Sequence, residues 1–126
     1  MAVNKGSRKT SDSSLPDEVS AAIEEMGGLD KLACSIPLPK EIAAEAELHH
    51  LLSDKTRLMI LYSLDCCEMC PCILKQYLKI SDSRLSYHLS ALEKFGLVTS
   101  YPKKNWRIFR ITEQGKAALG KRKSCP

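Results

Sequence analysis

The sequence predicts a mainly α-helical protein with one small β-hairpin near its C-terminus. Between residues 15 and 95, apolar side chains recur at intervals of three and four residues, which is the period of one helix face. Between residues 97 and 112, apolar and polar residues alternate about a Pro-Lys-Lys-Asn sequence, as in two strands joined by a turn. A chain of 126 residues with 44% hydrophobic content is expected to form one small domain, and helical folds of this size often bury further surface by dimerising.

The N-terminal region is expected to combine an unstructured arm with added helices. Residues 1–14 are polar, rich in serine and without periodicity, which predicts a disordered arm ahead of a single domain over residues 15–126. The spacing of Val19, Ile23 and Met26 predicts a short amphipathic helix that ends at Gly27-Gly28, and residues 29–33 can add another turn. Residues 40–52, rich in Ala, Glu and Leu, predict a longer helix.

Two further helices are expected in the middle of the chain. Ser53 or Asp54 can accept the free amide hydrogens of a helix over residues 55–64. Pro71 suits the first turn of the next helix, which should start between residues 68 and 70 and run to about Lys79. Its inward-facing residues are expected to be Ile73, Leu74, Tyr77 and Leu78.

The next helix has the pattern of a recognition helix. Ser81 is placed to cap it, and Gly96 is a stop signal after Phe95. Leu85, Leu89 and Leu92 are spaced for burial. The residues expected to remain exposed are polar and gather at its N-terminal end: Asp82, Ser83, Arg84, Ser86, Tyr87 and His88. That is the end of a recognition helix that reaches base edges in DNA.

The C-terminal region completes a known fold pattern. Residues 97–101 and 106–112 predict the hairpin, in which Tyr101 and Trp106 most simply pack, and the two lysines of its tip suit phosphate contact. A short helix over residues 113–119 and a basic tail follow. Three helices, a recognition helix, a hairpin wing and a final helix form the element order of a winged helix-turn-helix.

The charge is unevenly distributed along the chain. Residues 1–50 carry five Lys and Arg against nine Asp and Glu, whereas residues 51–126 carry fourteen against six. A basic half suggests a polyanion partner, because Lys and Arg release counterions from a phosphate backbone. A solvated basic surface is the simpler alternative.

Membrane association and secretion are not expected. The longest nearly unbroken apolar run, residues 58–64, is far below the ~18 residues that span a bilayer. The first 14 residues lack the apolar stretch of a signal peptide. The expected location is cytoplasmic, where thiols stay reduced.

Six cysteines are the most unusual feature, and four of them lie between residues 66 and 72. Without secretory features, such a cluster favours metal or redox chemistry over a disulfide framework. Burial as small hydrophobic residues explains one or two cysteines, but not four in seven residues. Pro71 divides the cluster: Cys70 and Cys72 are expected in the opening turn of a helix, and Cys66 and Cys67 in the connection before it.

Several separated motifs carry a resemblance to a known family. They are Asp54-Lys55-Thr56-Arg57-Leu58, Glu68-Met69-Cys70-Pro71-Cys72, Ser81-Asp82-Ser83-Arg84-Leu85-Ser86-Tyr87-His88-Leu89, and Trp106 in the wing. Over roughly residues 45–112 the chain resembles the ArsR/SmtB family of metal-responsive repressors, whose corresponding stretches look like D-P-T-R-L, E-L-C-V-C and S-x-S-T-V-S-x-H-L. The resemblance implies a homodimeric winged-helix repressor, not an enzyme, that leaves its operator DNA when an effector binds.

The chain also departs from the family pattern. Pro71 replaces the usual apolar residue between the paired cysteines, and Arg84 and Tyr87 replace the commoner Thr and Arg of the recognition helix. The operator sequence therefore cannot be carried over. A second family metal site, made of Asp and His on the C-terminal helix, has no counterpart, because residues 113–119 contain neither.

The resemblance implies that Cys70 and Cys72 bind a soft metal or metalloid. Thiolates suit As(III), Cd, Pb, Zn or Cu(I), and a trigonal thiolate site needs a third donor. Cys67 is the first choice because it is local, and the remaining candidates are Cys66, Cys34 and Cys125, including those of a second subunit. His49-His50 are better explained by packing or solvent exposure.

Three alternatives stay open. The thiols can act as a redox sensor, through a disulfide of Cys67 or Cys66 with Cys70, because a helix N-terminus favours the reactive thiolate. The cysteines can instead hold a constitutive structural zinc. A winged fold can also serve as a protein-interaction adaptor, in which the basic wing is incidental.

The main expectation is binding to double-stranded operator DNA. A homodimer would place two recognition helices in successive major grooves of a palindrome, about 34 Å apart. The residues expected to contact bases or lie beside them are Ser81, Ser83, Arg84, Ser86, Tyr87 and His88, and those expected to hold phosphates are Lys103, Lys104 and Arg107.

Overall fold

The computed structural model describes residues 14–120, so the predicted arm, apart from Ser14, and the basic tail with Cys125 lie outside the described residues. The chain divides into two compact units between Glu45 and Ala46. Within residues 14–120, no helix is both long and apolar enough to span a bilayer.

Over residues 14–45, the first unit consists of short helices, and none of these residues is buried. Helix α1 spans Asp17–Met26, α2 spans Gly28–Ser35, and α3, Pro39–Leu52, begins in this unit. Gly27 ends α1 at φ 111°, a left-handed conformation that glycine adopts without strain. The single turn expected after it is a full helix, and Gly28 begins this helix instead of ending the one before. No residue of α1 or α2 is buried.

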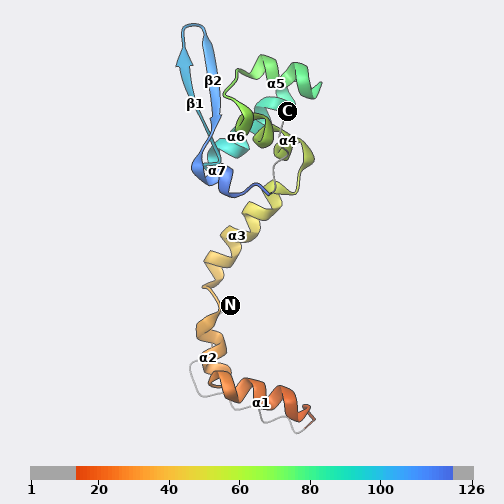
Figure 1. Ribbon diagram of the computed structural model, residues 1–126, viewed down its shortest axis with the longest axis vertical. Helices are drawn as coiled ribbons and strands as arrows, with labels where there is room; N and C mark the ends of the chain where they lie inside the picture. The colour runs from red at the N-terminus through yellow and green to blue at the C-terminus, as the bar shows by residue number, and fades with distance from the viewer. Residues whose placement is uncertain (1–13, 121–126) are drawn as a thin grey trace. The chain divides into compact units, whose positions relative to one another are not determined.

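The second unit contains the end of α3 and the winged helix-turn-helix elements. They are α4 Lys55–Cys66, α5 Pro71–Leu78, α6 Asp82–Lys94, β1 Val98–Lys103, β2 Trp106–Ile111 and α7 Glu113–Ala117. Figure 1 shows the β1–β2 hairpin extending away from these helices as the wing. The predicted fold, mainly α with a small hairpin, is confirmed.

Side-chain caps fix where three of these helices begin. The Asp54 carboxylate accepts the Arg57 amide at 3.1 Å, Ser81 Oγ accepts the Arg84 amide at 3.2 Å, and Thr112 Oγ1 accepts an amide at the start of α7 at 3.1 Å. A short polar side chain at this position satisfies amides that have no partner inside the helix. The caps expected at Asp54 and Ser81 are both present.

The wing is a two-stranded antiparallel sheet with a tight turn. Pairing runs from Val98 opposite Ile111 to Lys103 opposite Trp106. Pro102 lies within β1, opposite Arg107, so the four-residue turn expected from the sequence is only two residues long. Lys104, in this turn, has φ 57°, a left-handed conformation typical of tight hairpins.

An isolated bridge adds the α4–α5 connection to the wing sheet. The Met69 amide donates to the Phe109 carbonyl at 3.1 Å, and the Phe109 amide donates to the Met69 carbonyl at 2.9 Å. Because Met69 is held in extended conformation, α5 begins at Pro71 and not between residues 68 and 70 as expected. Helix α4 is also longer than expected and includes Cys66.

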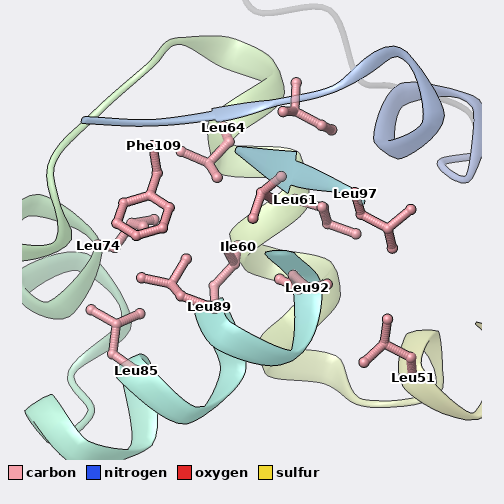
Figure 2. Packing of buried hydrophobic residues seen from close by; sticks show 12 residues of the cluster. Leu51, Ile60, Leu61, Leu64, Leu74, Leu85, Leu89, Leu92, Leu97 and Phe109 are labelled. Carbon is pink, nitrogen blue, oxygen red and sulfur yellow. The ribbon is translucent and has the colours of Figure 1, made fainter. Parts of the chain in front are cut away.

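One leucine-rich core holds the second unit together. Figure 2 shows its side chains pointing toward one another from the helices and the wing strands. The buried hydrophobic residues are Leu51, Ile60, Leu61, Leu64, Leu74, Leu85, Leu89, Leu92, Leu97, Val98, Phe109 and Ile111. The expected burial of Leu85, Leu89 and Leu92 is confirmed.

The expected burial of Ile73 and Tyr77 is wrong. These side chains are 49% and 66% exposed, whereas Leu74 is fully buried. Leu74 and Leu78 are four residues apart and form the stripe of α5 that meets the core, and Ile73 and Tyr77 form the neighbouring stripe. Only one side of the eight-residue helix α5 is therefore packed against the core.

We expect Leu74→Ala to lower the free energy of unfolding by about 2–5 kcal/mol, because it leaves a cavity in the core. Ile73→Ala, a change of similar size at the exposed neighbouring position, should cost less than about 1 kcal/mol. Urea unfolding followed by circular dichroism measures both. Equal losses for the two variants would contradict the packing described for α5.

Candidate nucleic-acid interface and thiol site

The N-terminal end of α6 presents an exposed polar surface. Lys79 ends α5 in a left-handed conformation at φ 55°, so that the chain turns directly into α6. Of the residues expected to face DNA on this helix, all but one are exposed: Ser81, Ser83, Arg84, Ser86 and Tyr87. Such an end can enter a major groove and reach base edges.

His88 is the exception, and the expectation that it is exposed is wrong. Its side chain is only 5% exposed, and its Nδ1 accepts a hydrogen bond from Arg57 Nε at 3.0 Å. His88 follows Leu85 by three residues and precedes Leu92 by four, which is the inward face of α6. That spacing was readable in the sequence.

Arg57 joins three helices at this position. Its Nη1 donates to the Leu51 carbonyl of α3 at 3.3 Å, while its Nε donates to His88 of α6. Its guanidinium also lies 5.6 Å from the ring centroid of Tyr87, within range of a cation–π interaction. Arg57 therefore holds α6 against α3 and α4. The neighbouring Tyr87, which was expected from the sequence to contact bases, is exposed.

The environment of His88 favours its neutral form. Burial lowers the pKa of His88, Asp54 opposes this, and the nearby Arg57 and Arg84 lower it further. Neutral His88 can accept the Arg57 hydrogen bond at Nδ1, whereas the protonated ring carries a proton on both nitrogens and cannot. Protonation would therefore break this contact and place two cations side by side.

The wing tip presents a basic surface. Lys103, Lys104 and Arg107 are exposed, as expected for phosphate contact. Trp106 beside them is 57% exposed and does not pack into the core. Within β1, Tyr101 donates a hydrogen bond to the Glu68 carboxylate at 2.5 Å, and this bond raises the pKa of Tyr101. Sequence reasoning missed this pair, because its members are 33 residues apart.

Two thiols lie at the start of α5. Cys70 is the N-cap residue, and Cys72 lies in the first turn. The neighbouring Cys72 side chain lowers the pKa of Cys70, and the backbone amides of Ile73 and Cys72 lower it further, against some burial. The Cys70 side chain in turn raises the pKa of Cys72. The environment at this helix start thus favours a thiolate at Cys70.

The three other cysteines among residues 14–120 do not form a metal site with Cys70 and Cys72. Cys66 is the last residue of α4 and Cys67 its C-cap, both exposed, and Cys34 is exposed in α2. Within residues 14–120, no three Cys, His, Asp or Glu side chains lie close enough to hold a metal ion. Cys70 and Cys72 offer two soft donors that suit a thiophilic ion, and a third donor is not preassembled around them.

The chain is similar to known regulatory proteins. Residues 54–100 match the family described as bacterial regulatory protein, arsR family. A protein of Halobacterium salinarum described as an arsenical resistance operon repressor is 31% identical over 105 residues, which are 82% of this chain and 78% of that one.

Solved structures are also similar. Reduced HlyU from Vibrio cholerae has a TM-score of 0.56 at 29% identity, over 62% of this chain and 83% of that one. A homodimeric winged helix-turn-helix DNA-binding domain, Mb0332 from Mycobacterium bovis, has a TM-score of 0.56 at 23% identity, over 62% and 72% of the two chains. At that identity the second likeness shows the fold alone.

The buried histidine predicts a pH dependence of stability. The pKa of folded His88 lies below its ordinary value of 6.5, so between those two values the unfolded chain binds more protons. The contribution of His88 is complete above about pH 6.5 and is lost as the pH falls toward the folded pKa, by at most about 1.4 kcal/mol per pH unit. Urea unfolding between pH 7.5 and 5 measures it.

His88→Asn is expected to flatten that slope, because the amide oxygen can accept the Arg57 hydrogen bond without titrating. His49→Asn, at an exposed position of α3, is the matched control and should keep the wild-type slope. If His88→Asn and wild type lose stability equally over this range, the buried neutral histidine is not the cause.

Proposed function

The chain belongs to the ArsR family of bacterial regulatory proteins, and we propose that it is a repressor released from operator DNA by a thiophilic metal or metalloid at Cys70 and Cys72. The observation that carries the proposal is the position of Cys70 and Cys72 at the start of α5, the helix that precedes the recognition helix. An effector that binds there would act on α5, and α5 packs against the proposed recognition helix α6.

We propose that α6 reads base edges and the wing holds the backbone. Ser83, Arg84, Ser86 and Tyr87 are exposed where a recognition helix meets the major groove, and Ser81 caps its first turn. Lys103, Lys104 and Arg107 supply positive charge at the wing tip. His88 acts indirectly, because it is buried and bonded to Arg57.

We further propose a homodimer on a palindromic operator. One recognition helix reads only a half-site, and a two-fold dimer places two of them in successive major grooves about 34 Å apart. The structurally similar Mb0332 domain is described as homodimeric, which supports this arrangement.

The donor chemistry favours a soft effector. Both thiols must ionise to bind, so binding releases their protons and forms two bonds from sulfur to the effector. The third donor has to be brought in. Cys67 is the nearest cysteine in sequence, and a shift of the α4–α5 connection would be the structural response. The arsenical resistance operon repressors among the relatives support As(III) as the first effector to test.

Redox sensing is the second candidate. Its supporting observation is the lowered pKa of Cys70, three residues after the exposed Cys67. A disulfide between them would form by loss of two electrons and two protons to an external oxidant such as a peroxide.

The wing proposal predicts how salt affects DNA binding. Lys103→Ala with Lys104→Ala should weaken binding to every duplex and lower the slope of log affinity against log salt concentration by about two, at about 0.9 for each phosphate contact. Arg84→Ala should instead cost about 1–3 kcal/mol of discrimination between sequences. Fluorescence anisotropy on a duplex selected from random sequences measures both. An unchanged slope in the lysine variant would remove the wing from the interface.

The sensing proposal predicts release by sodium arsenite. Affinity of the wild type for the selected duplex should fall by on the order of 5- to 150-fold, the usual range of coupling between sites. Cys70→Ser should bind DNA but not respond, and Cys34→Ser, an exposed thiol of α2, should respond as the wild type. Release by a peroxide alone, reversed by a dithiol reductant, would favour the redox candidate.

A further inference from the structure

The connection that carries the thiols is also part of the wing sheet. Met69 and Phe109 exchange both backbone hydrogen bonds, so this connection lies along the edge of β2 that β1 leaves free (Figure 1). Cys70 follows Met69 directly and begins α5. The thiol site and the DNA-contacting hairpin therefore share one hydrogen-bonded sheet.

A second contact crosses that sheet. The Tyr101 hydroxyl, on β1, donates to the Glu68 carboxylate at 2.5 Å, so the side chains bridge from the connection over β2 to the far strand. The Arg110 guanidinium lies 5.8 Å from the Tyr101 ring centroid on the same side. A hydrogen bond to a carboxylate is stronger than one between neutral groups, so the pair ties the connection to β1 more firmly than packing alone.

Cys70 lies on the face that carries this contact. Side chains alternate along an extended strand, so Glu68 and Cys70 share one face and Met69 points to the other, toward the core cluster. The residue that the effector would bind and the residue bonded to the wing are thus two positions apart on one surface.

We propose that the thiol site transmits its state to the wing through the Met69–Phe109 pairing and the Glu68–Tyr101 hydrogen bond, with Glu68 and Tyr101 as positioning residues for the response. This rests on the proposed function. Drawing Cys70 and Cys72 onto one ion together with a third thiol changes the backbone at Cys70, and Met69 and Glu68 cannot stay in place when their neighbour moves. The wing strands, bonded to both, then change the position of the lysines at their tip.

The competing route runs from α5 directly to α6. Its visible polar link, Lys75 to Asp82 at 3.0 Å, joins side chains that are 45% and 82% exposed, and such surface ion pairs are weak. Packing between Leu74 and Leu85 in the core remains on this route. A response carried by α6 alone leaves the wing unchanged, so the two routes differ in a measurable way.

The test uses the full chain with Cys34→Ser and Cys125→Ser, which leaves only the four clustered thiols. Trp106, at the wing tip, is the only tryptophan and reports on the wing through its fluorescence. Tyr101→Phe removes the hydroxyl that bonds Glu68 and keeps the ring, and Glu68→Gln weakens the same bond. Tyr77→Phe removes a hydroxyl from an exposed tyrosine of α5 and is the matched control.

Two probes separate the inference from the proposed function. Sodium arsenite tests effector binding. N-ethylmaleimide alkylates free thiols and therefore changes the site even if the protein does not bind a metalloid. We expect both probes to change Trp106 emission in the parent chain. The change should be less than half as large in Tyr101→Phe and intermediate in Glu68→Gln. In the Tyr77→Phe control it should equal that of the parent chain. The arsenite effect on DNA affinity should shrink at least about threefold in Tyr101→Phe, while its affinity without arsenite stays within about twofold.

If Trp106 does not respond, or all four chains respond alike, the wing route is overturned, and arsenite release of DNA would still support the proposed sensor. If arsenite has no effect but the maleimide response depends on Tyr101, the wing route stands and metalloid sensing fails. A variant that loses DNA affinity and arsenite response together, with a lower unfolding temperature, has a merely structural defect and contradicts the positioning role.

Discussion

The pairing of Met69 with Phe109 is the constraint on which most of the second unit depends. Two backbone hydrogen bonds hold the α4–α5 connection in extended conformation against β2. Because Pro71 follows, with no amide hydrogen to donate and a φ suited to a first turn, α5 begins there and Cys70 becomes its N-cap. The position of the thiol pair, the placement of Leu74 in the core and the anchoring of the wing all follow from this pairing.

A second polar contact organises the recognition helix from inside. Arg57 bonds to His88 and to the Leu51 carbonyl, and so joins α3, α4 and α6. A buried polar group without a partner costs free energy, and within the described residues no buried side-chain nitrogen or oxygen lacks one. The histidine near the proposed DNA surface thus helps to position α6, and Tyr87 beside it remains exposed.

The proposed effector site and the proposed DNA-contacting surface lie in different parts of the second unit. The thiols lie at the edge of the core, where a ligand can reach them, while the leucine cluster keeps α4, α5, α6 and the wing strands together. A local change at Cys70 can therefore be passed on by bonded neighbours without unfolding the core. If the protein is a repressor as proposed, its effector has to shift an equilibrium between two arrangements of these elements, one that binds DNA and one that does not.

The sequence was enough to predict the fold class, the order of elements, the caps at Asp54 and Ser81 and the exposure of most residues proposed to face DNA, because these depend on local periodicity and short-range hydrogen bonds. It did not determine that Ile73 is exposed, that α5 begins only at Pro71 or that Glu68 bonds Tyr101. The start of α5 and the Glu68–Tyr101 bond depend on partners 40 and 33 residues away, which no local pattern encodes. The exposure of Ile73 depends on which stripe of α5 meets the core. His88 combines both kinds of information. Its spacing in the sequence places it on the inward face of α6, and the tertiary structure brings Arg57 beside it as the hydrogen-bond partner that a buried histidine needs.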